Sequence, residues 1–376
     1  MKMKKCRVCG KNFTGKLLLC YKNMPKAAQF FPKKSNFKRE KGIDLQVWQC
    51  NSCGVVQLSG APVPYYKQVI RASGFSDKMK VFRERQFKDF IYKYSLRNKR
   101  IIEIGCGGGE YMSIMKKCGV KVYGIEHSKK LVKLCLSKGL TVINGFVSNE
   151  NCRIKYSPYD SFYMLSFLEH IPFPGETLRG IYNNIVDEGV GLVEVPNFDM
   201  ILRKELFSEF IMDHLLYFTK ETLVRVLEVN GFDVLECKSI WYDYILSAVV
   251  KKRKLLDLSS FYDKQKVIET DIKKYIYKFK SIAIWGAGHQ SLSIISLLNL
   301  KNKIKYIIDS ATFKQGKYSP ATHIPIVSPQ QAKMNPVESI IVIAGSYSDE
   351  VANIIKREFD KNIKVAILKD FGLEVV

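Results

Sequence analysis

Apolar positions along the chain alternate between two spacings, and this alternation predicts strands separated by helices. From residue 77 to 96 they recur at helical intervals, and short apolar runs then alternate with amphipathic segments to about residue 250. A second alternation of the same kind begins at residue 281, after a charged, helical stretch over 255–280. Strands that alternate with helices form parallel sheets covered on both faces, so we predict an α/β fold with two such units.

The first unit carries a glycine-rich turn between its first strand and the next helix. The apolar run 101–104 leads directly into Gly105, Gly107 and Gly109, and the second strand ends in Glu126. Ligands of open α/β sheets bind outside the carboxyl ends of the strands, and an acidic residue at the end of the second strand can accept hydrogen bonds from ribose hydroxyls. The pattern therefore predicts a Rossmann-like unit that binds a nucleoside.

The glycine spacing indicates which nucleoside the unit binds. Glu103 followed by alternate glycines differs from the G-x-G-x-x-G dinucleotide fingerprint. It resembles motif I of the class I methyltransferases, which bind S-adenosylmethionine, and Glu126 resembles their ribose-binding residue. A unit for another nucleotide is the alternative. The resemblance assigns these residues to the cofactor: Glu103, Gly105, Cys106, Gly107, Glu126, His127, Phe146 and Ser166.

A pair of cysteine motifs near the N-terminus predicts a metal site. Cys6 and Cys9 form one C-x-x-C-G unit, and Cys50 and Cys53 form another. Two such units can converge into a tetrahedral shell of four thiolates for zinc, and the glycine after each pair allows a sharp turn. Because four thiolates leave no open coordination position, the expected Zn²⁺ is structural.

The whole chain resembles the sugar C-methyltransferases of deoxysugar biosynthesis. Those proteins have a Glu-His pair shortly before Tyr-Phe-Ser, and here Asp213 and His214 precede residues 217–219. Their last domain carries a Lys-Gln-Gly-Lys stretch and a Thr-His-Ile-Pro-Ile stretch, which correspond to 314–317 and 322–326. The resemblance implies a zinc module at 1–60, a methyltransferase domain at 61–252 and a smaller Rossmann-like domain at 253–376.

The resemblance also implies a reaction. In that family a carbon beside a ketone of a nucleotide-linked sugar loses a proton, and the resulting enolate takes the methyl group. By this resemblance His214 is the base, and a histidine that titrates near neutrality suits that role. The carboxylate of Asp213 would orient its ring. A structural loop histidine is the alternative for His214, and we expect His170 to shape the cofactor pocket rather than to act as a base.

The acceptor is less well defined, because the chain departs from the family where the active site is covered. Lys67 and Arg71 add charge to a segment that is rich in tyrosine and serine in the family, and Asp213 replaces a glutamate. A phosphorylated acceptor and O-methylation therefore remain open. The last domain either helps to hold the nucleotide or only closes the cleft. The residues expected to contact the substrate are Tyr65, Tyr66, Ser76, Lys314 and His323.

Composition decides between the remaining classes of function. The chain has 376 residues and a formal net charge of +24, which would favour a nucleic-acid partner if the lysines were clustered, but they are spread along the sequence. The fourth strand is followed by residues 165–168, Leu-Ser-Phe-Leu, rather than the Asn/Asp-Pro-Pro-aromatic motif of base-amino methyltransferases. We therefore expect a small-molecule substrate, a sugar nucleotide or sugar phosphate. A nucleic-acid methyltransferase and a non-enzymatic scaffold that binds S-adenosylmethionine are less favoured.

The lengths of the apolar stretches and the character of the N-terminus bear on where in the cell the protein is expected. Its apolar stretches are far shorter than the ~20 residues of a membrane span, and the basic N-terminus runs into Cys6 without an apolar segment. We expect a cytoplasmic protein, monomeric, with cysteines that serve as ligands or buried thiols rather than disulfides.

Overall fold

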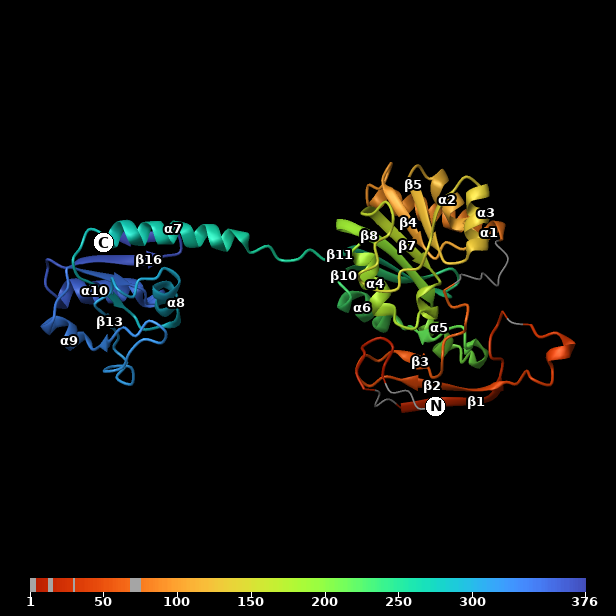
Figure 1. Cartoon of the computed structure of the whole chain (residues 1–376), viewed down its shortest axis with the longest axis horizontal. Coiled ribbons are helices and arrows are strands. Elements are labelled where there is room, and N and C mark those ends of the chain that lie inside the picture. The colour runs from red at the N-terminus through yellow and green to blue at the C-terminus, as the bar shows by residue number, and fades with distance from the viewer. Residues whose placement is uncertain (1–4, 13–15, 30, 68–75) are drawn as a thin grey trace. The chain divides into compact units, whose positions relative to one another are not determined.

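The computed structural model describes residues 5–12, 16–29, 31–67 and 76–376. These form two compact units, Met1–Leu255 and Leu256–Val376, shown in Figure 1. The segment 64–76 is expected to cover the active site, and most of it, including Arg71, lies outside the described residues. The division of the first unit near residue 60 stays a prediction, because the cysteine module and the larger sheet fall within one compact unit.

The first unit begins with a small antiparallel sheet that recruits a strand from far along the chain. Its order is β1-β2-β3-β9, and Val56 of β3 pairs with Tyr217 of β9. The backbone N–H of Leu58 also donates to the carbonyl of Leu215 at 3.0 Å. The cysteine module is therefore joined directly to the segment that contains Asp213 and His214. The elements are β1 Lys16–Met24, η1 Lys34–Asn36, β2 Ile43–Gln49, β3 Val56–Leu58 and β9 Leu216–Tyr217.

The larger sheet of this unit is the predicted Rossmann-like sheet. Its order is β10-β11-β8-β7-β4-β5-β6, and all neighbours are parallel except the pairs that β11 makes with β8 and β10. The strand order reverses between β4 and β7, which is where ligands bind in such sheets. The strands are β4 Arg100–Ile104, β5 Lys121–Glu126, β6 Thr141–Asn144, β7 Tyr159–Leu165, β8 Ile185–Pro196, β10 Phe232–Ile240 and β11 Ile245–Lys252.

Helices cover both faces of this sheet because its central strands are apolar on both sides. Ile101 packs with α1 and α2 in one buried cluster, whereas its neighbour Ile102 belongs to the cluster that contains α4 and α6. Thr219 caps α6 through a capping box with Thr222. The helices are α1 Asp77–Lys93, α2 Glu110–Lys117, α3 Lys129–Ser137, η2 Leu168–His170, α4 Pro174–Tyr182, α5 Phe198–Arg203, η3 Phe207–Glu209 and α6 Lys220–Val229.

The second unit is a smaller Rossmann-like fold with its own core. Its sheet order is β14-β13-β12-β15-β16-β17, and only the pairing of β17 with β16 is antiparallel. Buried residues form a cluster on each face of the sheet. The elements are α7 Ser259–Ile276, β12 Ile282–Trp285, α8 His289–Leu297, β13 Tyr306–Ile308, β14 Ile326–Val327, α9 Pro329–Met334, β15 Ser339–Val342, η4 Gly345–Tyr347, α10 Ser348–Glu358, β16 Lys364–Lys369 and β17 Gly372–Val375.

The predicted fold class is confirmed by these two sheets. Within the described ranges, no helix has the length and apolar character needed to cross a membrane.

Candidate functional site

The glycine turn after β4 has the left-handed backbone that the sequence predicted. Gly105, Gly107 and Gly109 have φ values of 71°, 56° and 76°. A Cβ on Gly109 would lie 2.5 Å from a methyl carbon of Leu140, so this position accepts only glycine. The turn therefore brings backbone amides close to the carboxyl end of the sheet, where a side chain would otherwise intervene.

Glu126, at the end of β5, holds this turn in place. One of its carboxylate oxygens accepts the backbone N–H of Gly107 at 3.1 Å, and the other accepts that of Ser128 at 2.8 Å. The side chain is 1% exposed. Two backbone donors stabilise the ionised carboxylate at the predicted ribose position and fix its orientation.

A hollow opens beside the turn, and four of the eight predicted cofactor residues line it. These are Gly105, Glu126, His127 and Phe146. Sequence reasoning missed Phe167, although its place directly after the fourth strand was a usable signal. The full lining is Lys67, Ile104, Gly105, Ile125, Glu126, His127, Gly145, Phe146, Val147 and Phe167.

The other four predicted cofactor residues lie outside this lining. Gly107 is not part of the lining, but its backbone N–H donates to Glu126, which is. Cys106 is completely buried, and Glu103 is a buried residue of β4 that accepts the hydroxyl of Tyr163 at 2.9 Å. Ser166 is exposed at the end of β7 with a φ of 49°. Their assignment to the cofactor stays a prediction.

Aromatic rings and one lysine also line the hollow. The ring of Phe146 meets those of Tyr66 and Phe167 edge-on, with centroids 6.1 and 6.2 Å away. The ammonium of Lys67 lies 5.5 Å from the centroid of Phe146. Backbone amides, an acidic residue and aromatic rings around one hollow form a donor set that suits a nucleoside. The residues present therefore fit the adenosine part of S-adenosylmethionine.

Two histidines meet a few residues beyond this hollow. The rings of His170 and His214 are perpendicular, with centroids 4.8 Å apart. Their segments are fastened together: His170 Nδ1 lies 2.7 Å from the carbonyl oxygen of Asp213, and Leu215 N–H donates to the carbonyl of Glu169 at 2.9 Å. Since η2 follows Phe167 directly, these bonds place His214 next to the segment that lines the cofactor hollow.

The carboxylate of Asp213 has other partners than the sequence led us to expect. It accepts the hydroxyl of Tyr65 at 2.7 Å and the backbone N–H of Ala28 at 2.8 Å. No hydrogen bond in the described part of the chain joins it to the ring of His214. The expectation that this carboxylate orients His214 therefore does not match the geometry: Asp213 orients Tyr65 instead. The other two predicted substrate residues of this unit lie apart from this bond, since Tyr66 packs on Phe146 and Ser76 caps α1.

Burial sets the protonation of these groups. Loss of hydration, together with the neighbouring His170, lowers the pKa of His214 to about 3. The pKa of His170 is lowered for the same reason, while burial raises the pKa of Glu169 to about 8. In this structure His214 is therefore a neutral imidazole at pH 7, rather than a group that titrates near neutrality.

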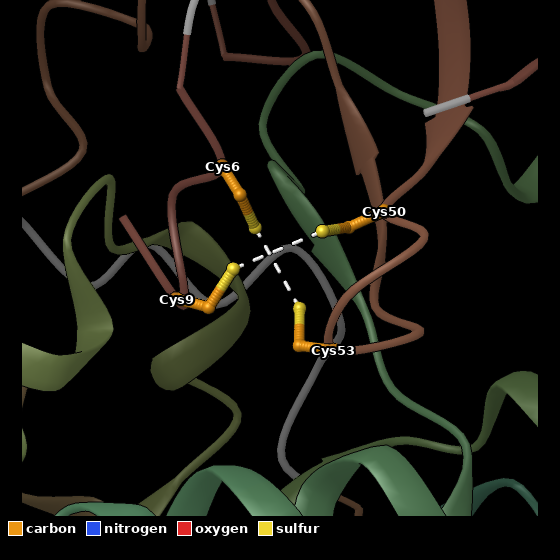
Figure 2. Close-up of side chains that lie close together, drawn as sticks. All are labelled: Cys6, Cys9, Cys50 and Cys53. Carbon is orange, nitrogen blue, oxygen red and sulfur yellow. Dashed lines mark hydrogen bonds between the residues drawn. The ribbon is translucent and has the colours of Figure 1, made fainter. Parts of the chain in front are cut away.

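The four predicted zinc ligands converge, as Figure 2 shows. The Sγ atoms of Cys6 and Cys53 are 3.6 Å apart, and those of Cys9 and Cys50 are 3.8 Å apart. Thiolates about 2.3 Å from one tetrahedral zinc ion lie roughly 3.8 Å from each other. Gln57 also donates to the Sγ of Cys6 at 3.2 Å. The donor set and its spacing fit a structural zinc ion.

Of the two predicted substrate residues of the second unit, Lys314 is connected to its glycine turn through Asp309. Asp309, at the end of β13, accepts the backbone N–H of Ala287 at 2.8 Å and the ammonium of Lys314 at 2.9 Å. The side chain of Lys314 is thus held by its ion pair with Asp309. His323 is exposed and has a φ of 55°. The carboxylate of Asp309 is thus paired with the ammonium of Lys314, which argues against a dinucleotide site at this turn.

Comparisons with known proteins agree with this architecture. Residues 79–237 match the family described as "Methyltransferase domain", and residues 255–367 match "C-methyltransferase C-terminal domain". The C-methyltransferase NovU of Streptomyces niveus is 21% identical over an alignment that covers 95% of this chain and 93% of NovU. The ubiquinone biosynthesis O-methyltransferase of Aeromonas salmonicida is 26% identical, over 39% of this chain and 68% of its own length.

Solved structures with a similar fold are more distant. The complex between the Haloferax volcanii Trm112 methyltransferase activator and a methyltransferase aligns at 14% identity over 47% of this chain and 95% of that chain, with a TM-score of 0.38. An S-adenosylmethionine-dependent methyltransferase from Listeria monocytogenes aligns at 16% identity over 46% and 100%, with a TM-score of 0.37.

Proposed function

Because the chain belongs to the C-methyltransferases that join a methyltransferase domain to a C-methyltransferase C-terminal domain, we propose that it methylates a carbon of a nucleotide-linked keto sugar. Dependence on S-adenosylmethionine follows from the family. The nature of the acceptor is the proposed part. The observation that carries the proposal is the position of His214, which backbone hydrogen bonds hold beside the segment that lines the cofactor hollow.

The proposed chemistry assigns a different task to each group. S-adenosylmethionine supplies the electrophilic methyl group when bound. His214 removes a proton from the carbon beside the ketone, and the electron pair of that C–H bond forms the new C–C bond as the S–CH₃ bond breaks. The neutral ring has a lone pair with which to take the proton. Glu126 and the glycine turn hold the adenosine, so the methyl group and the acceptor meet in a fixed orientation.

Asp213 acts in this proposal by positioning Tyr65. The carboxylate holds the Tyr65 hydroxyl and the backbone of Ala28, and that hydroxyl also accepts the N–H of Gln29 at 3.1 Å. Three separate segments of the first unit thus meet at one carboxylate. We expect Tyr65 to contact the sugar, with Tyr66 and Ser76 nearby.

O-methylation of a small anionic acceptor is the second candidate. Part of the chain matches ubiquinone biosynthesis O-methyltransferases, and Lys67 places a positive charge at the cofactor hollow. A phosphorylated acceptor would use that charge.

The test is methyl transfer from ¹³C-methyl-labelled S-adenosylmethionine to a panel of nucleotide-linked keto sugars. We expect a labelled product whose new methyl group is bonded to carbon by NMR. A methyl group bonded to oxygen would favour the second candidate. His214→Asn should reduce turnover by roughly 10²–10⁴-fold. Full activity of this variant would remove His214 as the base, provided that it binds S-adenosylmethionine as the unchanged protein does.

A further inference from the structure

A carboxylate without a partner lies beside the two histidines. Glu169 is 1% exposed, and its Oε2 atom is buried with no hydrogen-bond partner in the described structure. Its other oxygen, Oε1, lies 3.8 Å from Nε2 of His170. No lysine or arginine among the described residues forms an ion pair with it. A buried carboxyl oxygen that has neither a hydrogen bond nor a cation has lost its hydration without compensation, so Oε2 of Glu169 is left without a partner.

The two histidines present free ring nitrogens to the same place. His170 is oriented through Nδ1, which lies against the carbonyl oxygen of Asp213, so the proton sits on Nδ1 and the lone pair on Nε2. The ring of His214 makes no hydrogen bond within the parts of the chain that the structure describes. A histidine that binds a metal ion through one ring nitrogen usually donates the N–H of its other ring nitrogen to a carboxylate, a backbone carbonyl or water.

The three side chains are close enough to share one ion. One potential ligand atom from each of Glu169, His170 and His214 lies within 4.8 Å of the others. Ligands at ~2.0–2.2 Å from a zinc ion lie roughly 3–4 Å from each other, so small side-chain rotations would complete the geometry. Two imidazoles and one carboxylate suit a divalent transition-metal ion rather than Mg²⁺ or Ca²⁺.

We propose that Glu169, His170 and His214 form a second metal site, for a divalent transition-metal ion such as Zn²⁺ and separate from the four cysteines. Three protein ligands leave at least one coordination position open to water or to an oxygen of the acceptor. The site has a consequence that rests on the proposed function. The lone pair of His214 serves either the ion or the substrate proton, so an occupied site suppresses C-methylation.

The ion itself is the probe in the binding test. Full-length protein carrying one zinc equivalent is titrated with Co²⁺ at neutral pH. A second equivalent in this site gives weak visible bands, without the near-ultraviolet charge-transfer absorption that cobalt bound to thiolates shows. The expected result is one such equivalent per chain. Absence of a second equivalent overturns the proposal.

Two variants locate the bound ion. Glu169→Gln keeps the side-chain volume, and His170→Asn keeps an N–H donor for the Asp213 carbonyl while removing the second ring nitrogen. Each variant should lower the affinity for the second Co²⁺ ion by at least about tenfold. Even the loss of a residue that only hydrogen-bonds to a metal ligand lowers metal affinity by about 10–100-fold. His289→Ala, at an exposed histidine of the second unit, is the matched control and should leave it unchanged. A second equivalent that survives both ligand variants places the ion elsewhere and overturns the proposal.

Methyl transfer separates the site from the base assignment. With binding confirmed, added Zn²⁺ should lower turnover in proportion to occupancy of the second site, and Glu169→Gln should be less sensitive to it. Turnover that rises with occupancy would leave the metal site standing and contradict His214 as the base. The Co²⁺ titration is carried out without substrate, so its result does not depend on the outcome of the methyl-transfer assay.

Discussion

At the scale of single residues, the positions that matter most are held by backbone groups. Glu126 accepts two backbone N–H groups, and His170 is oriented by a backbone carbonyl. In each of these contacts one partner is a backbone group, so only one side chain has to adopt a particular rotamer. The contacts therefore fix the site before any ligand arrives. The effect of a substitution can therefore be derived from the bonds that it removes.

Replacing Glu126 should weaken recognition of the cofactor. Glu126→Ala removes the carboxylate at the ribose position and frees the N–H of Gly107, so we expect affinity for S-adenosylmethionine to fall at least ~10-fold, about 1.4 kcal/mol. The measurement is the rise in melting temperature on adding the cofactor, which should be smaller at each cofactor concentration. Glu84→Ala, at an exposed carboxylate of α1 paired with Lys88, is the control. A normal rise in Glu126→Ala would contradict the assignment.

Asp213 and Tyr65 should behave as one unit. Because the carboxylate bonds the Tyr65 hydroxyl rather than the His214 ring, Asp213→Asn and Tyr65→Phe each break the same contact. We expect the double variant to lose little more activity than either single variant, with a coupling free energy of about 0.5–3 kcal/mol. A double-mutant cycle on kcat/KM measures this. Strictly additive effects would show that the two side chains act separately.

At the scale of elements, the small sheet connects the metal module to the catalytic segment. β3 follows Cys53 and pairs with β9, which follows His214. Arg225 on α6 also donates to the carbonyl of Cys53 at 3.1 Å. A distortion at the cysteines is therefore transmitted through backbone hydrogen bonds to the histidine pair.

Removing zinc should consequently reduce activity as well as stability. We expect Cys53→Ser to lower the melting temperature of the first unit and to lower kcat, because β3 loses its anchor and β9 loses its partner. Zinc content, calorimetry and turnover check this. Cys20→Ser, at an exposed cysteine outside the cluster, is the control and should retain all three. Full activity in a zinc-free protein would show that the module does not support the site.

At the scale of the whole molecule, the two Rossmann-like sheets have opposite relations to their glycine turns. Both acidic residues accept backbone N–H groups, but Glu126 lies beside a hollow whereas Asp309 also forms an ion pair with Lys314. The same fold therefore presents a ligand site in one unit and an internally satisfied turn in the other. This difference supports a cofactor site in the first unit alone and a different task for the second.

Much of this could be read from the sequence, because it depends on local patterns. The strand before Gly105 and the cluster of four cysteines follow from periodicity and spacing, and the structure has them as predicted. The role of Asp213 could not be read in this way. Its partners Tyr65 and Ala28 are separated from it by 148 and 185 positions, and no local pattern encodes such contacts.

By itself, then, the sequence determined the α/β class, the glycine turn with Glu126, and the four-cysteine set, since steric freedom, strand periodicity and ligand spacing act over a few residues. Only the tertiary structure decided which groups meet. It paired β3 with β9, turned Asp213 toward Tyr65, and set Glu169 beside His170 and His214. These contacts arise from packing distant segments together, and burial then changes the pKa of His214 and of Glu169.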